Sequence, residues 1–333
     1  MIKGMDEVKE VVSQLKACFE KRNGMKSIFF VACGGSLAAS YPARYMLEME
    51  SLSLRVYGIN SGEFVTSLPA SVNESALVIA ISTKATPETV EALALARKAG
   101  AVTVGMTGEA DSLTAENADY KLVYLHADEW YKDPRLIHCN SQGTALKLAF
   151  ELLNEFEGYP NYDKAMAALE MFPQIYATAY NKVKSRAVAF GMRYKDDTIF
   201  NVLSSGAAWE VSYSDAFCFF QEMQTVHCVP CHSGEYFHGA FETTDSNLAI
   251  ILFKSAGRTR PLDERAERFL EKFGGHHYVV DALELGIGSI ETEVIDYFNA
   301  LLMHPISKQL ISGMGEIRMH PMSYRRYMWK FAY

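Results

Sequence analysis

The chain has 333 residues, of which 49% are hydrophobic and 22% charged, and its formal net charge is −8. This length favours two domains, and the composition is that of a globular chain with sizeable cores rather than a disordered one. The acidic balance argues against nucleic acid and anionic membranes as partners.

The first 25 residues predict an amphipathic helix that carries acidic side chains and lacks the apolar centre of a signal peptide. The longest apolar runs, such as LAIILF at 248–253, are far shorter than the roughly 20 residues that a membrane span requires. Six cysteines scattered over such a chain indicate reduced thiols. We therefore expect a cytoplasmic protein that binds neither nucleic acid nor membranes.

The first half of the chain alternates β-rich runs with helix-length segments. Strands are expected at residues 26–33, 53–60, 75–82, 101–107 and 120–125. After the third strand, Thr86 fits a helix cap, Pro87 the first helical position and Gly100 the C-terminal end. Strands separated by helices predict βαβ units, and hence a parallel sheet with helices on both faces.

The second half repeats this pattern. Residues 198–223 match residues 27–49 as strand, small-residue turn and long helix, with Ile28 and Ile199 lying 171 positions apart. The apolar run at 248–253 aligns with the third strand at the same offset. The repeat predicts two tandem α/β domains of the doubly wound, three-layer α/β/α class, each with a parallel five-stranded sheet. The expected divisions are an N-terminal helix at 1–25, domains at 26–158 and 196–333, and a helical connector at 159–195.

Ligands bind at the carboxyl ends of the strands in such sheets, because helices begin there with free N–H groups. In the first half the loops at these ends are CGGS (33–36) and STKAT (82–86). They offer a phosphate the residues Gly35, Ser36, Ser82, Thr83, Lys84 and Thr86. The same hydroxyls also fit ordinary turns and helix caps. The dinucleotide pattern GxGxxG is missing from the CGGS loop.

The stretch HCVPCH (227–232) invites three interpretations that depend on its cysteines. CxxCH is the pattern of covalent haem, which belongs to exported proteins. A zinc site needs four ligands in a tetrahedron, and no second CxxC or HxxxH pair completes one. A redox dithiol prefers the start of a helix just after a strand, whereas this CxxC follows a helix. We interpret the cysteines as incidental and expect no metal and no cofactor.

A glutamate and a histidine remain as candidates for chemistry. Glu222 lies late on a helix expected at 207–224, and His238 follows sixteen residues later in a loop. A carboxylate and an imidazole that converge over a sugar phosphate could move a proton and assist the leaving oxygen. Such a pair is often structural, and Glu210, Asp215 and Glu235 are rival carboxylates. The second-half loop begins with Phe253 and Lys254, which suit a phosphate poorly, so we expect one half to hold the anion and the other to supply the chemistry.

Several sequence blocks resemble the SIS (sugar isomerase) domain proteins. They are VACGGS, STKATPET, EMQ…SGEYFHG and the tail HPMSYRRYMWKFAY (320–333), and together they span essentially the whole chain. The resemblance extends to the isomerase half of glucosamine-6-phosphate synthase and, most specifically, to the fructosamine 6-phosphate deglycases. It implies that Ser36, Ser82, Thr83 and Thr86 hold a sugar phosphate. It also implies that Glu222 is the base, that His238 is the acid, and that a homodimer or higher homo-oligomer forms the site at its subunit interface.

The chain departs from the family pattern at two loops. The usual SxSGxT loop is here the shorter STKAT, with Lys84 at a position where a small residue is common. The familiar HGP becomes His238-Gly239-Ala240. The synthase has a ring-opening lysine near its C-terminus, and Lys330 is its candidate counterpart, although Lys330 fits a surface or tail-packing lysine equally well. Glu235 completes the expected substrate-binding residues. A glutaminase segment is missing upstream, which disfavours ammonia-dependent glucosamine synthesis.

The resemblance implies a deglycase that hydrolyses a 6-phosphorylated Amadori product to glucose 6-phosphate and a free amine. Its partner would be a small phosphosugar-amine substrate. An aldose–ketose or amino-sugar phosphate isomerase would use the same proton transfer without hydrolysis. A non-catalytic phosphosugar-binding module is the third alternative, although it would not need both Glu222 and His238.

Overall fold

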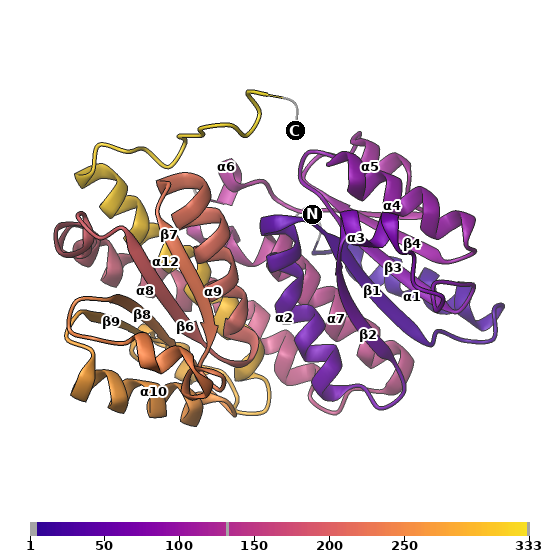
Figure 1. The fold of residues 1–333 in the computed structure, drawn as a ribbon. Coiled ribbons are helices and arrows are strands. Elements are labelled where there is room, and N and C mark those ends of the chain that lie inside the picture. Colours follow the sequence, from indigo (N-terminus) through magenta and orange to yellow (C-terminus); the bar gives the residue numbers. More distant parts are fainter. Residues whose placement is uncertain (1–4, 131–132, 332–333) are drawn as a thin grey trace. The chain divides into compact units, whose positions relative to one another are not determined.

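A computed structural model describes residues 5–130 and 133–331, which form two compact units, residues 1–173 and 174–333 (Figure 1). The long helix α8, Tyr162–Tyr194, passes through this division, with Pro173 inside it. Most of the stretch expected as a connector, 159–195, lies in this helix. The expected domain boundaries at 158 and 196 stay a prediction.

Unit 1 contains all five strands that the sequence predicts for this half, each within two residues of its expected ends. The strands are β1 Ser27–Ala32, β2 Arg55–Asn60, β3 Ala76–Ile81, β4 Val102–Thr107 and β5 Tyr120–Val123. The helices are α1 Glu7–Glu20, α2 Gly34–Glu50, α3 Ser61–Thr66, α4 Pro87–Lys98, α5 Leu113–Glu116, α6 Ala127–Trp130 and α7 Ser141–Glu157, with a 3-10 helix at Pro134–Cys139.

The strands of unit 1 form one parallel sheet in the order β2-β1-β3-β4-β5. Phe29, Val31 and Val78 pack against α3 and α4 on one face. Because side chains alternate along a strand, Ile28 and Phe30 point to the opposite face. Helices α2 and α7 lie side by side in unit 1, and α2 also contacts β1 and β2 (Figure 1). The predicted parallel sheet, with helices on both faces, is thereby confirmed for this half.

Unit 2 has four strands and a more irregular set of helices. The strands are β6 Ile199–Ser204, β7 His227–His232, β8 Ala249–Lys254 and β9 His277–Asp281. The helices are α9 Trp209–Ser214, α10 Arg260–Phe273, α11 Ala282–Leu285 and α12 Asn299–Ile317, with a π-helix at Asp215–Met223. Short 3-10 helices lie at Gly206–Ala208, Tyr236–His238, Ala240–Thr243, Ile287–Ser289 and Ile295–Phe298.

The sheet of unit 2 is parallel in the order β7-β6-β8-β9, so the expectation of five strands is wrong for the described part of this half. After β9 the chain turns through α11 and two 3-10 helices into α12, and the described residues, up to 331, supply no counterpart of β5. The edge strand β7 contains the CxxC stretch, which was not expected to form a strand. Pro230 fits this edge position because it has no N–H to donate to a neighbouring strand.

The helix expected at 207–224 is divided into three segments: a 3-10 turn, α9 and the π-helix. Cys218, Phe219 and Phe220 of the π-helix are buried, and Phe220 stacks on Phe200 of β6. On the other face of the sheet, Leu203, Ile250 and Leu252 pack against α10.

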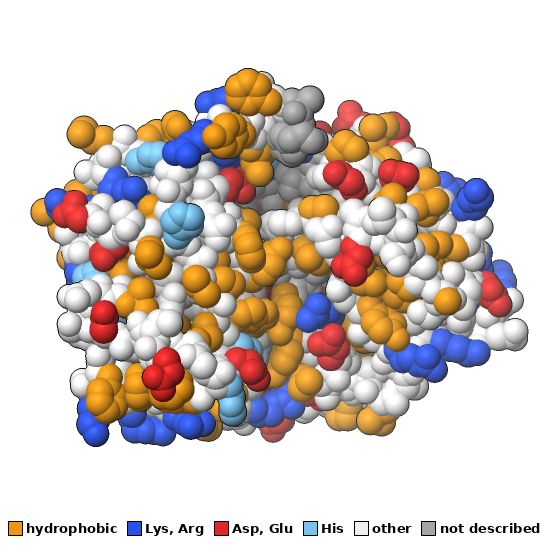
Figure 2. Space-filling view, in the orientation of Figure 1, with side chains coloured by type: hydrophobic (Ala, Val, Ile, Leu, Met, Phe, Trp, Pro, Cys, Tyr) orange, Lys and Arg blue, Asp and Glu red, His pale blue; other side chains and the backbone are white. Residues whose placement is uncertain are grey.

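No helix in the described residues is long and apolar enough to cross a membrane. Acidic and basic side chains are interspersed over the face of the molecule shown in Figure 2.

Candidate functional site

The loops expected to hold a phosphate follow two neighbouring strands of unit 1. β1 pairs with β2 on one side and with β3 on the other, so the chain changes direction between β1 and β3. Ligands bind at such a switch point in open parallel sheets. The structure therefore brings the 33–36 and 82–86 loops, which are 49 residues apart, to adjacent strand ends.

The 82–86 loop is closed by its own hydroxyls. Ser82 is buried, accepts a 2.8 Å hydrogen bond from the N–H of Thr86 and lies 3.1 Å from the Thr86 hydroxyl. Thr83 Oγ1 lies 2.8 Å from the hydroxyl of Tyr124, a partner that nothing in the sequence predicts. Burial raises the pKa of Tyr124 to about 12, so Tyr124 stays neutral. Thr86 is the N-cap residue of α4 and Pro87 occupies the first turn, both as predicted, but the Thr86 side chain makes no capping hydrogen bond.

The other residues of these loops face solvent to different degrees. Gly34 has a φ of +51°, which allows α2 to start directly after β1, and Ser36 N–H donates to Cys33 O at 3.1 Å. Gly35 and Lys84 are exposed, and Ser36 is half-buried. The arrangement suits an anion, because hydroxyls and helix N-termini meet at one edge of the sheet.

In unit 2, Glu222 lies near the end of the π-helix with 20% of its side chain exposed. Its Oε1 accepts a hydrogen bond from Arg325 Nη2 at 2.6 Å. Burial raises the pKa of Glu222, and the Arg325 guanidinium only partly opposes this shift. A carboxylate whose pKa lies closer to neutrality is a better general base than an ordinary glutamate. π-Helical segments are rare and frequently lie at functional sites.

His238 ends a 3-10 helix and is exposed, and its N–H donates to Glu235 O at 2.9 Å. Glu235 is also exposed. Gly239, with a φ of +137°, follows His238 in a conformation that strongly favours glycine. Within residues 5–130 and 133–331, no hydrogen bond or ion pair joins Glu222 to His238.

The C-terminal segment supplies the partner of Glu222. Arg325 is 10% exposed, and its guanidinium carbon lies 5.2 Å from the ring centroid of Trp329. Lys330 Nζ donates to the carbonyl of Arg325 and lies 5.5 Å from the centroid of Tyr324. Lys330 thus contacts other residues of the tail, and its expected role at the sugar stays a prediction. Arg325 has no periodicity or spacing signal in the sequence that marks it as this partner.

The rival carboxylates Glu210 and Asp215 are fully buried. Glu210 lies 2.9 Å from His304 Nδ1, and Ser307 donates a hydrogen bond to Asp215. Burial raises the pKa of Asp215 well above its usual value. Both acids are thereby removed from solvent.

The CxxC cysteines lie within β7, where residues three apart point to opposite faces. Within the described residues, no three His, Cys, Asp or Glu side chains are placed to hold a metal ion together.

Comparison with known proteins places these residues in a family. The model of the SIS domain matches residues 23–152. The chain is similar to the fructosamine deglycase FrlB of Bacillus subtilis (strain 168), with 35% identity over 92% of each chain. It is also 24% identical to the fructoselysine 6-phosphate deglycase of Escherichia coli (strain K12), over 78% of this chain and 74% of that one.

A solved structure from Salmonella typhimurium LT2, provisionally named a phosphosugar isomerase, has a TM-score of 0.93 to this one. It is 34% identical and covers 100% of both chains. The switch-point loops of unit 1, the family model over the same residues and the similarity along nearly the whole chain agree, and the chain belongs to the SIS domain family.

Proposed function

We propose that the protein is a deglycase that hydrolyses a 6-phosphorylated Amadori product to glucose 6-phosphate and a free amine. The observation that carries this proposal is the 35% identity to a fructosamine deglycase over 92% of the chain. Glu222 supports it, because a partly buried carboxylate with a raised pKa has the property that the proton transfer requires.

Glu222 would remove a proton from C1 of the ketoamine, giving an enaminol in which C1 and C2 are joined by a double bond. Return of the proton to C2 converts the C1–N bond into an imine. Water then adds to C1, the C1–N bond breaks and the amine leaves with a proton. His238, which is exposed and held on its short helix, would act as acid and base at the sugar oxygen during ring opening or enolisation.

The phosphate would bind to the loops of unit 1, with Gly35, Ser36, Ser82, Thr83, Lys84 and Thr86 as its ligands. The chain would thus consist of two tandem SIS domains, the first binding the phosphate and the second carrying the acid–base residues. Glu235 and Lys330 would bind the sugar. We also propose that the protein is cytoplasmic and that it forms a homodimer or higher homo-oligomer with its sites at the subunit interface.

The test is release of glucose 6-phosphate from fructoselysine 6-phosphate by the wild type, Glu222→Gln and the control Glu242→Gln. Glu242 is an exposed carboxylate outside the proposed site. The proposal expects the wild type and the control to turn over at similar rates. It expects Glu222→Gln to lose at least about 100-fold, the usual contribution of a general base. Wild-type release that survives Glu222→Gln would reject Glu222 as the base.

A phosphosugar isomerase is the second candidate, because the Salmonella typhimurium protein of the same fold, 34% identical, carries that provisional name. Interconversion of ketose and aldose phosphates by the wild type, without release of an amine, would favour this candidate over the deglycase.

A further inference from the structure

Unit 2 contains a five-residue loop at the place in its sheet that the 82–86 loop has in unit 1. Ser255-Ala256-Gly257-Arg258-Thr259 links β8 to α10 at the switch point between β6 and β8, as Ser82–Thr86 links β3 to α4. Ser255 Oγ lies 3.3 Å from Thr259 Oγ1, and Ser82 Oγ lies 3.1 Å from Thr86 Oγ1. The neighbouring loops also agree, since Gly206 after β6 has a φ of +56° and Gly34 after β1 a φ of +51°.

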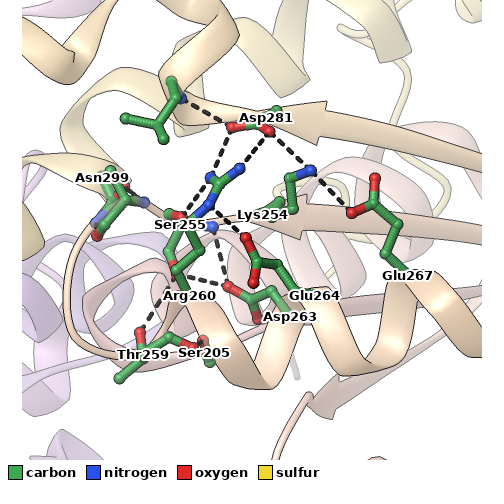
Figure 3. Close-up of polar contacts among 12 residues, drawn as sticks. Ser205, Lys254, Ser255, Thr259, Arg260, Asp263, Glu264, Glu267, Asp281 and Asn299 are labelled. Carbon is green, nitrogen blue, oxygen red and sulfur yellow. Dashed lines mark hydrogen bonds and ion pairs between the residues drawn. The ribbon is translucent and has the colours of Figure 1, made fainter.

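The N–H groups of the unit 2 loop bind oxygen atoms of this chain's own side chains. Ser255 N–H and Oγ–H donate to Asp263 Oδ2 at 2.9 and 2.5 Å. Ala256 N–H donates to Asn299 Oδ1 at 2.7 Å, and Arg258 N–H donates to Asp296 Oδ1 at 2.8 Å. Figure 3 shows Asp263 beneath Ser255, with Thr259 and Ser205 on the same side. In a phosphate site, the phosphate oxygens would accept hydrogen bonds of this kind.

Asp263 stands where strands β6, β7 and β8 end. It is fully buried on the first turn of α10, where the helix dipole favours a negative charge. Burial raises the pKa of Asp263, whereas the hydroxyls of Ser233, Ser255 and Ser205 act in the opposite direction. Ser205, Ser233 and Ser255 each follow a different one of these strands directly.

Glycine makes room for the second carboxylate. A Cβ atom at Gly257 would lie 2.5 Å from Asp296 Oδ1, and Gly257 has a φ of +98°. Arg258 Nε also donates to Asp296 Oδ2 at 3.1 Å. Close approach of an anion to a glycine-containing loop is a usual feature of phosphate sites, and here the anion is an aspartate.

We propose that the Ser255–Thr259 loop is a second anion site of the phosphate-binding type, which the chain fills with the carboxylates of Asp263 and Asp296. The loop is therefore closed to sugar phosphates, and each chain binds one phosphate rather than two. In unit 1 the position of Asp263 is occupied by Val90, which has no carboxylate to fill the 82–86 loop. Each of the two residues lies eight positions after its loop serine and is the fourth residue of its helix. The inference concerns unit 2 and does not depend on the deglycase reaction.

The test removes the built-in anion and offers an external one. Thermal unfolding of Asp263→Ala is followed in formate, in phosphate and in chloride at equal ionic strength. The controls are the wild type and Glu264→Ala, which removes the adjacent carboxylate of α10; Glu264 bonds to Arg260 and to none of the loop N–H groups. Asp263→Asn, a further control, keeps a side chain of the same size beside the loop N–H groups but removes its negative charge.

We expect Asp263→Ala to unfold several degrees lower in chloride and to recover saturably in formate or phosphate. Titration calorimetry should detect one more bound anion per chain, formate or phosphate, than in the wild type. Asp263→Asn and Glu264→Ala should show no such additional response. An Asp263→Ala response equal to that of the wild type overturns the proposal. If Asp263→Ala does not fold in chloride, its refolding yield is compared in phosphate and in chloride. A higher yield in phosphate supports the proposal, and equal yields overturn it.

The reciprocal change is Val90→Asp, with Val90→Asn as its uncharged control. The added carboxylate should raise the Kd for phosphate at the unit 1 site by about tenfold or more, which corresponds to about 1.4 kcal/mol of binding free energy. Unchanged affinity in Val90→Asp would contradict the equivalence of the two loops. A wild type that binds no phosphate would instead reject the phosphate site of unit 1, and the Asp263→Ala result would still decide the inference for unit 2.

Discussion

Arg325 and Glu222 form a close ion pair, 2.6 Å long, although they are 325 − 222 = 103 positions apart in the chain. The pair connects the C-terminal segment to the π-helix of unit 2. Burial raises the pKa of Glu222, and the positive charge of Arg325 lowers it. Removal of Arg325 should therefore raise the pKa of Glu222 further.

If Glu222 is the base, Arg325→Ala should move the acid limb of the pH–rate profile to higher pH, since Glu222 must be ionised to take a proton. The measurement is kcat/KM for glucose 6-phosphate release as a function of pH. Arg326→Ala, at the exposed neighbouring position, is the control and should leave the limb in place. An unshifted limb in Arg325→Ala would show that this pair does not tune the base.

The buried Asp215 makes stability depend on pH. Burial raises its pKa well above 3.8, so its stabilising contribution is complete below that ordinary value and is lost as the pH rises through its folded-state pKa. Asp215→Asn should therefore lose less stability than the wild type as the pH rises from about 4 to about 7. Urea unfolding at several pH values measures the difference, with the exposed Asp111→Asn as control. Parallel curves for Asp215→Asn and the wild type would contradict the prediction.

Two glycines allow α8 and α12 to pack closely within unit 2. A Cβ atom at Gly191 would lie 2.6 Å from the carbonyl oxygen of Gly313, and a Cβ atom at Gly313 would lie 2.5 Å from that of Ala187. Gly191→Ala and Gly313→Ala should each lower the free energy of unfolding by about 1–3 kcal/mol, because the helices must move apart. At Gly288 the nearest atom would be 3.5 Å away, so Gly288→Ala should change stability little. Equal stabilities for the three variants would refute this close packing.

Most thiols of the protein should react slowly. Burial raises the pKa of Cys231 to about 11 and those of Cys139 and Cys218 to about 12. At pH 8 these side chains are almost entirely protonated, and the thiolate is the reactive form. Titration with a disulfide reagent should modify the half-buried Cys18 and Cys33 first and the others only after unfolding. Rapid modification of Cys231 in the folded protein would contradict the structure.

The sequence determined the elements that depend on near neighbours. Apolar runs such as 27–32 and 76–81, punctuated by Gly34 and Pro87, predicted the strands of unit 1 and the starts of their helices, because propensity and turn chemistry act within a few residues. The repeat at 171 positions predicted a second parallel sheet, and the resemblance of the longer blocks identified the family.

Which distant groups meet depends on the packing of the folded chain. The polar stretch of β7 becomes an edge strand because β6 offers it hydrogen bonds, and nothing in its composition predicts this pairing. The contacts of Arg325 with Glu222, of Thr83 with Tyr124 and of Asp263 with Ser255 depend on how helices and tails pack on the finished sheets. The periodicity of a sequence indicates which face of a helix or strand is apolar, but it does not indicate which side chain packs against that face. From the sequence, the unit 2 loop therefore seemed unsuited to a phosphate because of Phe253 and Lys254, whereas in the structure the N–H groups of Ser255 and Arg258 bond to the chain's own carboxylates.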